Sequence, residues 1–398
     1  MKMMTAAARE TEASTSGEIL YLALELGEKR WRVATTIGFG ASPRQVWIAS
    51  RSREELEREI ERARQRFGLA ASSRVVSCYE AGRDGFWVHR MLAKLGVENR
   101  VVDSSSIEVN RRRRRAKSDQ LDADSLLRML IRYELGDHKV WKVVHVPSVA
   151  AEDLRHVQRG LGTLKKERTR QINRIKGLLA AVGVTLRAGW KELPHELDRV
   201  RQWDGSPLGE RLRRRLGYEH ERLMMIARQI REVEAARREA IRISPEGVGC
   251  AANPQLTAKV AAQARKLIEL RAIGDAGGWL FASEFFAWRE IRNRRQIGSL
   301  AGLVPTPYQS GESAREQGVS KAGNRYVRAM AVELAWRWLH HQPQSALSRW
   351  YHERFARSGQ RMRKIGIVAV ARKLLIALWR YLEHGVVPEG AVLKPSPA

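Results

Sequence analysis

The sequence predicts an α/β domain followed by a helical connector and a mostly helical C-terminal domain. Three observations lead to this fold class. Strand-like and helix-like patterns alternate in residues 18–135, two long amphipathic patterns follow, and a break containing glycine and proline at 244–254 precedes another helical region. We therefore expect an α/β domain at 18–145, a coiled-coil connector at 150–245 and a C-terminal domain at 255–385.

The first domain is expected to contain five strands and three helices. The apolar run at 19–24 is typical of a buried central strand, and residues 51–67 place apolar side chains at helical spacing. The remaining elements are predicted as strands 31–37, 46–49, 74–79 and 100–102, and helices 86–95 and 118–133. Three strands followed by alternating helices and strands is the order of the ribonuclease-H-like fold, which is an analogy at the level of fold alone.

Four acidic residues lie where these elements begin or end. Glu25 ends the first strand and Glu80 the fourth, and Asp119 and Asp122 share one face of the last helix. Carboxylate oxygens are the ligands that hard divalent cations such as Mg²⁺ or Mn²⁺ prefer, and such ions can hold both sides of a phosphodiester. We therefore predict a metal site at these four residues. The alternative is that the two aspartates only stabilise the positive end of their helix.

The chain is strongly basic. Its 398 residues include 72 Lys and Arg against 44 Asp and Glu, a formal charge of +28. Neutralising DNA or RNA phosphates is the commonest reason for such a surplus, and the alternative is a basic surface that is merely solvated. The N-terminus has no apolar signal segment, and the apolar stretch at 365–382 is interrupted by two cations. We expect a cytoplasmic, nucleoid-associated protein with no membrane partner.

Candidate phosphate contacts occur in two short segments. Such contacts position a nucleic acid without reading its sequence, although a charge run can also be a solvated face. The first segment precedes the helix at 118–133, and the second is expected to open a helix at 319–328 after a polar loop. The residues are Arg111, Arg112, Arg113, Arg114, Arg115 and Lys117 in the first, and Lys321, Asn324, Arg325 and Arg328 in the second.

The connector is predicted to consist of two long helices at 152–179 and 208–241, each with an apolar seam and basic flanks. Such a pair forms either an antiparallel helical hairpin or a coiled-coil dimer arm. An ordinary helical bundle is the remaining alternative.

Several motifs resemble those of one protein family. Lys117-Ser118-Asp119-Gln120-Leu121-Asp122-Ala123 resembles the Lys-Thr/Ser-Asp-x-x-Asp-Ala motif of the insertion sequence 110 family of transposases, and Glu80-Ala81-Gly82 resembles its Glu-x-Gly motif. Gly302-Leu303-Val304-Pro305, Gln309-Ser310-Gly311 and Ser320-Lys321-Ala322-Gly323-Asn324 are similar, in this order, to motifs of the family's C-terminal transposase domain. The resemblance extends over about 20–382.

The resemblance implies a RuvC-like DEDD domain, a coiled-coil connector and a C-terminal domain with a nucleophilic serine. Carried over, the catalytic quartet is Glu25, Glu80, Asp119 and Asp122, and the nucleophile is Ser310. The implied activity is metal-assisted recombination of the element's DNA ends with a target, in which a noncoding bridge RNA can choose both. Strand exchange among four DNA ends favours a homodimer or homotetramer.

The sequence departs from the family pattern at Glu25, and two other functions stay open at this point. The family's first acidic residue is usually Asp, whereas this chain has Glu25. Because Mg²⁺ tolerates little distortion of its geometry, metal binding is expected to differ or to be impaired. The alternatives are a metal-dependent junction nuclease that uses water, and an inactive copy that only binds nucleic acid. Without the family motif, Ser310 is a common turn residue, and Ser313 and Ser320 are further candidates.

Overall fold

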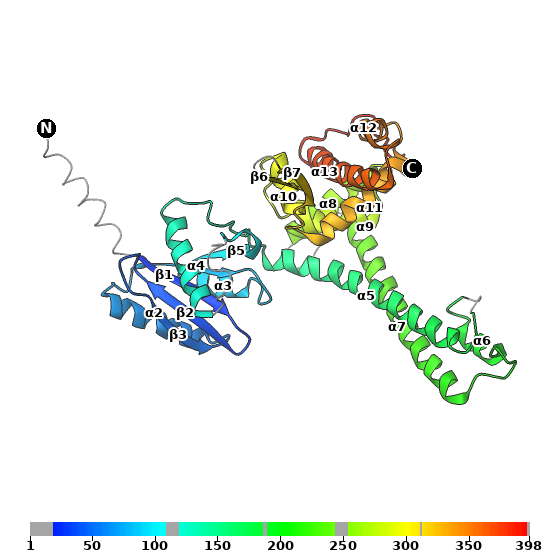
Figure 1. The fold of residues 1–398 in the computed structure, drawn as a ribbon, viewed down its shortest axis with the longest axis horizontal. Coiled ribbons are helices and arrows are strands. Elements are labelled where there is room, and N and C mark those ends of the chain that lie inside the picture. Colours follow the sequence, from blue (N-terminus) through cyan, green and yellow to red (C-terminus); the bar gives the residue numbers. More distant parts are fainter. Residues whose placement is uncertain (1–18, 109–118, 186–188, 243–253, 311–312, 396–398) are drawn as a thin grey trace. The chain divides into compact units, whose positions relative to one another are not determined.

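The computed structural model describes residues 19–108, 119–185, 189–242, 254–310 and 313–395. These form two compact units, Met1–Pro147 and Ser148–Ala398 (Figure 1). The first is a mixed α/β unit and the second is mostly helical. The arginine run and Lys117, at 111–117, lie outside the described residues.

The first unit is built on a five-stranded mixed sheet. Its strands are β1 (Ile19–Leu26), β2 (Arg30–Thr36), β3 (Arg44–Ala49), β4 (Arg74–Glu80) and β5 (Glu98–Val102). In the order β3-β2-β1-β4-β5, strands β1, β4 and β5 are parallel and β2 is antiparallel to both neighbours. The five strands predicted from the sequence are confirmed, with ends shifted by at most two residues.

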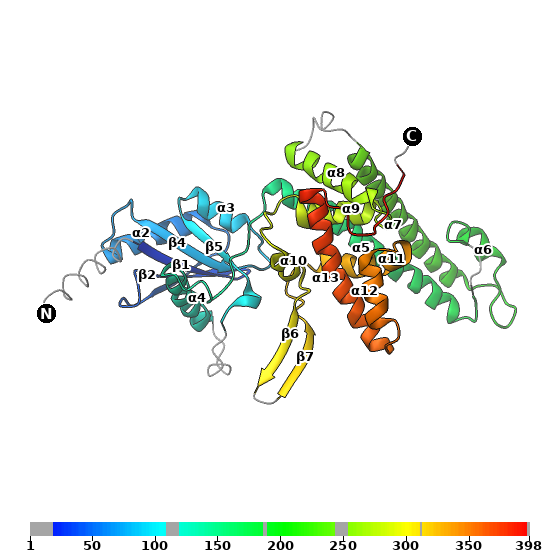
Figure 2. The ribbon, with the colours of Figure 1, turned by 90° about the horizontal axis from the view of Figure 1, so that it is seen from above.

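Helices cover both faces of this sheet. They are α2 (Arg53–Phe67), α3 (Trp87–Lys94) and α4 (Asp119–Glu134). Alternate residues of a strand point to opposite faces. Leu22 and Leu24 of β1 therefore pack with α2 and α3, whereas Tyr21 and Ala23 pack with α4 (Figure 2). A carboxylate that continues the alternation of Tyr21 and Ala23 along β1 therefore also points toward α4.

The second unit begins with two long helices, α5 (Val149–Ala180) and α7 (Glu210–Arg242), joined through α6 (Leu193–Arg199). Lys165 Nζ lies 2.7 Å from Glu234 Oε1, and Gln171 bonds Glu219 further along. Since residue numbers rise along α5 as their partners' numbers fall along α7, the helices are antiparallel. Of the arrangements left open by the sequence, the antiparallel pair is the one seen within this chain (Figure 1).

The remaining elements pack around one core. They are α8 (Pro254–Glu269), α9 (Asp275–Phe281) continued by a π-helical turn (Ala282–Phe286), α10 (Arg294–Ala301), β6 (Pro305–Ser310), β7 (Ser313–Val319), α11 (Arg325–His341), α12 (Ala346–Phe355) and α13 (Gln360–His384). Trp338 lies in this core with no exposed surface and donates from Nε1 to Ser345 Oγ at 2.9 Å. Burial of such large side chains supplies most of the stabilisation.

The segment at 305–319 differs from its prediction. Instead of a polar loop followed by a helix, it forms the antiparallel hairpin β6–β7, which extends away from the helices of its unit in Figure 2. Helix α11 begins only at Arg325, because Asn324 Oδ1 caps it by accepting from the Tyr326 and Val327 amides. Residues 319–328 therefore do open a helix, but it begins at Arg325, six residues later than expected.

Candidate functional site: an acidic cleft and a serine hairpin

An acidic cleft of about 610 Å³ lies at the carboxyl ends of β1 and β4, against α4. Glu25 continues the series of side chains of β1 that point toward α4, and Glu80 does the same on β4 after Val76 and Cys78. Because β1 and β4 are parallel neighbours, their carboxyl ends meet at one edge. The carboxylates that line the cleft are Glu25, Glu28, Glu80, Asp84 and Asp122.

The cleft brings together three members of the predicted quartet. Glu25, Glu80 and Asp122 line it, and Oε2 of Glu25 is buried. Asp119 begins α4, but its side chain lies outside the described ones. Within the described part of the chain, no three His, Cys, Asp or Glu side chains lie close enough to share a metal ion. The oxygen donors suit a hard cation, whereas a complete ligand set is not assembled among them.

The sequence reasoning missed Asp84, which lies in the turn after β4. Its side chain is only 8% exposed and lies 3.7 Å from an Arg83 guanidinium nitrogen. The Tyr79 hydroxyl donates to the Gly85 carbonyl oxygen at 3.0 Å and so holds this turn against the strand. The available signal was the sequence Gly82-Arg83-Asp84-Gly85, whose residues favour a tight turn directly after Glu80.

Ser310 lies at the far end of β6, opposite Ser313 of β7 in the register of the hairpin. Residues 311–312 between them, and the side chains of 308–317, lie outside the described ones. The two candidate serines therefore lie opposite each other at the facing ends of β6 and β7. Ser320 lies beyond the other end of β7, where its amide donates to the Val304 carbonyl oxygen at 2.9 Å.

The motifs around this hairpin fit together through their backbones. The Asn324 amide donates to the Leu300 carbonyl oxygen at 2.8 Å, and the Lys321 amide donates to that of Gly302 at 3.2 Å. Gly323 has a φ of +151°, and a Cβ there would lie 2.5 Å from the Leu300 oxygen. Only glycine allows this approach. The two glycine-containing motifs thus fix the base of the hairpin.

The predicted phosphate contacts of this segment have different surroundings. Lys321 and Arg325 are exposed, whereas Arg328 donates from Nη1 to the Lys321 carbonyl oxygen at 2.8 Å. The Asn324 amide group caps α11 and also donates to Glu284 Oε2 at 3.0 Å. Lys321 and Arg325 are thus the members of this group with the greatest access to a nucleic acid.

Glu284, in the π-helical turn, was also missed by the sequence reasoning. Its side chain has no exposed surface and accepts from Arg159 of α5 at 2.9 and 3.1 Å. The bond to Glu284 raises the pKa of Arg159, while burial, with repulsion from Arg155, lowers that of Arg289 to about 9. Buried ion pairs of this kind depend on tertiary contacts, so no local pattern in the sequence indicated this one.

Comparison with known proteins first identifies the class of this chain. A sequence profile described as "Transposase IS116/IS110/IS902 family" matches residues 264–351, from within α8 into α12. This region includes the β6–β7 hairpin and the motifs at its base. Among the described residues, no helix is long and apolar enough to cross a bilayer.

Two relatives then define the family. The chain is 38% identical to "Putative transposase y4rJ" of Sinorhizobium fredii, over 98% of this chain and 100% of the relative. It is 25% identical to "Transposase for insertion sequence element IS1111A" of Coxiella burnetii, over 67% of this chain and 66% of the relative. The chain therefore belongs to the IS116/IS110/IS902 family of transposases, which confirms the family resemblance inferred from its motifs.

Proposed function

We propose that this transposase excises and inserts an insertion sequence by attack of Ser310 on DNA phosphodiesters, guided by a bridge RNA. The observation that supports the serine assignment is its position at the end of β6, inside the region that matches the family. A residue at the outer end of a projecting strand pair can enter a DNA substrate without moving the protein core.

In the proposed reaction, Ser310 Oγ forms a bond to the phosphorus of one phosphodiester as its proton is lost. One P–O ester bond breaks, and the released strand ends in a hydroxyl that takes up a proton. In the second step, a strand hydroxyl attacks the phosphoserine, loses its proton, and returns Ser310 to its free form. No phosphodiester bond is lost in the complete cycle, so no external energy source is required.

The first unit is proposed to be a RuvC-like domain that binds Mg²⁺ or Mn²⁺. The strand order β3-β2-β1-β4-β5, with β2 antiparallel, supports this assignment. Glu25, Glu80 and Asp122, with Asp119 from the same end of α4, would hold the cation. A bound cation would stabilise negative charge on a phosphate. The described carboxylates do not by themselves form a complete ligand set for this cation.

The proposed partners are the DNA ends of the element, its target, a bridge RNA, and further copies of this chain. The formal charge of +28 supports contact with more than one polyanion. Strand exchange between four DNA ends supports a homodimer or homotetramer. The proposed place of action is the nucleoid in the cytoplasm, where DNA substrates are found.

Trapping on suicide DNA tests the serine assignment. A nicked substrate that loses a short fragment after attack should leave wild-type protein covalently attached to DNA. Ser310→Ala should give no adduct, whereas Ser313→Ala and Ser320→Ala should retain it. An adduct formed by Ser310→Ala would overturn the assignment. Loss of the adduct only in Ser313→Ala would identify Ser313, on the opposite strand, as the nucleophile.

The acidic cleft favours a second candidate function, a metal-dependent junction nuclease in which water attacks. That enzyme would use the same carboxylates and would not need the serine. Cleaved DNA without any covalent adduct, unchanged in Ser310→Ala, would support it. If neither cleavage nor an adduct is seen with cognate element ends, this chain is an inactive copy that only binds nucleic acid.

A further inference from the structure

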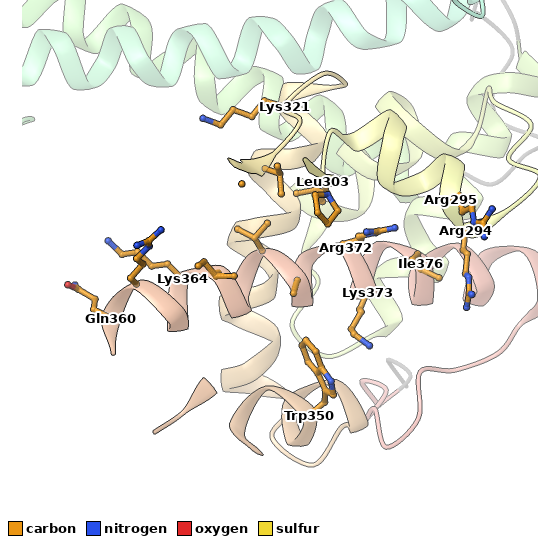
Figure 3. Close-up of a pocket in the computed structure, with 17 residues that line it drawn as sticks. Arg294, Arg295, Leu303, Lys321, Trp350, Gln360, Lys364, Arg372, Lys373 and Ile376 are labelled. Atoms are coloured by element: carbon orange, nitrogen blue, oxygen red, sulfur yellow. The ribbon is translucent and has the colours of Figure 1, made fainter. Parts of the chain in front are cut away.

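A basic groove of about 1160 Å³ lies in the second unit, between α10, the base of the β6–β7 hairpin, α12 and α13 (Figure 3). Seven cationic side chains line it, and the lining contains no carboxylate. None of the seven forms an ion pair with a described carboxylate in this structure. They are Arg294, Arg295, Lys321, Arg361, Lys364, Arg372 and Lys373.

The floor of the basic groove is apolar. Leu303, Val319, Val368 and Ile376 contribute to it, and Ile365 is 44% exposed on α13. Long apolar side chains in an open groove mark a binding surface more often than a solvated one. The occupant should therefore present both negative charge and apolar surface.

Two contacts hold cationic side chains in place along α13. Lys373 Nζ lies 4.5 Å above the ring of Trp350, within the range of a cation–π interaction. A Cβ at Gly298 of α10 would lie 2.9 Å from Arg372 Nε, so the guanidinium packs directly on that helix. In Figure 3, Lys364, Arg372 and Lys373 follow one another along α13. The positive charges thus form a line rather than a single cluster.

We propose that the basic groove binds an unpaired DNA strand, with its phosphates on the cationic rim and its bases on the apolar floor. A duplex presents phosphates but keeps its base faces stacked, so the floor would remain uncovered. An unpaired strand exposes base faces to apolar and aromatic side chains. The choice of DNA rests on the proposed function, since a DNA transposase must handle separated strands at its cleavage sites.

The position of the groove relative to Ser310 supports this assignment. Pro305, Gly318 and Val319, at the base of the hairpin, line the groove, and Ser310 lies at the other end of β6. Five residue steps along a strand span about 17 Å. A strand bound in the groove would thus start beside the hairpin that holds the proposed nucleophile.

The test measures binding by fluorescence anisotropy with a labelled single-stranded DNA of mixed sequence, using Ser310→Ala protein without added divalent metal so that the DNA stays intact. Arg361→Glu should weaken binding about fivefold and reduce the slope against log salt by about one. Arg363→Glu is the matched control, since Arg363 is exposed on the same helix but does not line the groove. It should change binding less than twofold, and circular dichroism should show both variants folded.

A second pair of variants tests the apolar floor. Ile365→Asn should weaken binding of the single strand about threefold with an unchanged salt slope, because a base contact and no phosphate contact is lost. Met362→Asn is the control, since Met362 is 45% exposed on α13 outside the groove. Ile365→Asn and Met362→Asn should each change the affinity for blunt duplex DNA by less than twofold.

Four results would overturn the proposal. If the groove and control variants lose the same amount of DNA affinity, the groove is not the binding site. If affinity for duplex and for single-stranded DNA falls equally, the bases do not contact the floor of the groove. Tighter, groove-dependent binding of the matching RNA would identify RNA as the occupant. Competition by an acidic peptide at the same concentration as DNA would identify a protein. Because these measurements record binding to intact DNA and need no cleavage, a failed adduct trap leaves them unaffected.

Discussion

The acidic cleft of the first unit and the basic groove of the second show how different folds arrange charge. In the cleft, carboxylates at the ends of two parallel strands and on α4 face one small volume. In the groove, long cationic side chains spread along α13 and the elements beside it. Strand ends bring short side chains toward a point, whereas a helix distributes long ones along a line. The first arrangement suits an ion and the second a linear polyanion.

The largest expected effect tests the acidic side of this comparison. Asp122→Ala should lower strand exchange by about a thousandfold while DNA affinity stays within a few fold. The reason is that Asp122 would help to hold the cation, and the cation would stabilise negative charge on the phosphate. A plasmid assay that counts recombined junctions, with DNA binding measured in parallel, checks this. Glu61→Ala, on the exposed surface of α2, should have wild-type activity. Full activity in both Asp119→Ala and Asp122→Ala would contradict a metal site at this cleft.

The next largest effect concerns Glu284, a carboxylate buried in the second unit. Glu284→Ala should lower the free energy of unfolding by about 3 kcal/mol, because Arg159 and Asn324 lose the buried carboxylate to which they donate. Urea unfolding followed by tryptophan fluorescence measures this loss. Glu290→Ala removes an exposed carboxylate six residues further on and should cost less than about 0.5 kcal/mol. Equal losses in the two variants would show that Glu284 has no special role.

A smaller effect is expected from Glu25→Asp, which sharpens the description of the cleft. Shortening this side chain to the residue usual in the family should raise strand exchange about tenfold at limiting Mg²⁺, if the longer side chain impairs the metal geometry. Titration of activity against Mg²⁺ and Mn²⁺ gives the result. A decrease in activity at every metal concentration would show that this cleft is adapted to glutamate.

The smallest effect is a pH dependence in the antiparallel helices. Burial tends to raise the pKa of Glu219, but hydrogen bonds from Gln171 and Arg174 outweigh it and leave the pKa below its usual range. Since the folded-state pKa is lowered, this contribution to stability is present at neutral pH. It is lost as the pH falls below about 4, through the folded-state pKa.

Thermal unfolding of wild type and Glu219→Gln at pH 7 and at about pH 3 measures this contribution. The wild type should lose about 1 kcal/mol more than the variant between the two pH values, because the variant has no carboxylate to protonate. Glu221→Gln, an exposed neighbour on α7, should follow the wild type. A variant that loses as much stability as the wild type would contradict the role of Glu219.

Much of the α/β unit could be predicted from the sequence because its signals are local. Apolar runs define the strands, and Glu25 and Glu80 stand directly at strand ends, so chain order alone placed them together. The hairpin at 305–319 was not predicted, because its strands contain Pro305, Pro307 and Gly318 and few apolar residues. Backbone contacts between 300–304 and 320–324 fix its base, and these are tertiary.

The basic groove and Glu284 had no local signal at all. The residues that line the groove come from α10, the hairpin, α12 and α13, over 80 positions of the chain, so their convergence depends on the packed core. Glu284 is surrounded by residues of α5 and of the segment before α11. A charged residue between phenylalanines in sequence gives no indication of partners 125 and 40 residues away.

The contact between Arg159 and Glu284 has a mechanical consequence. Arg159 lies in the third turn of α5, so about 32 Å of this helix extends beyond it. Glu284 also accepts from Asn324, the residue that starts α11 and adjoins the base of the serine hairpin. A load applied by a partner at the far end of α5 and α7 would therefore reach the hairpin through a stiff rod and two side-chain bonds. Lengthening α5 by one residue beyond Arg159 would turn that far end by about 100° while leaving the anchor in place.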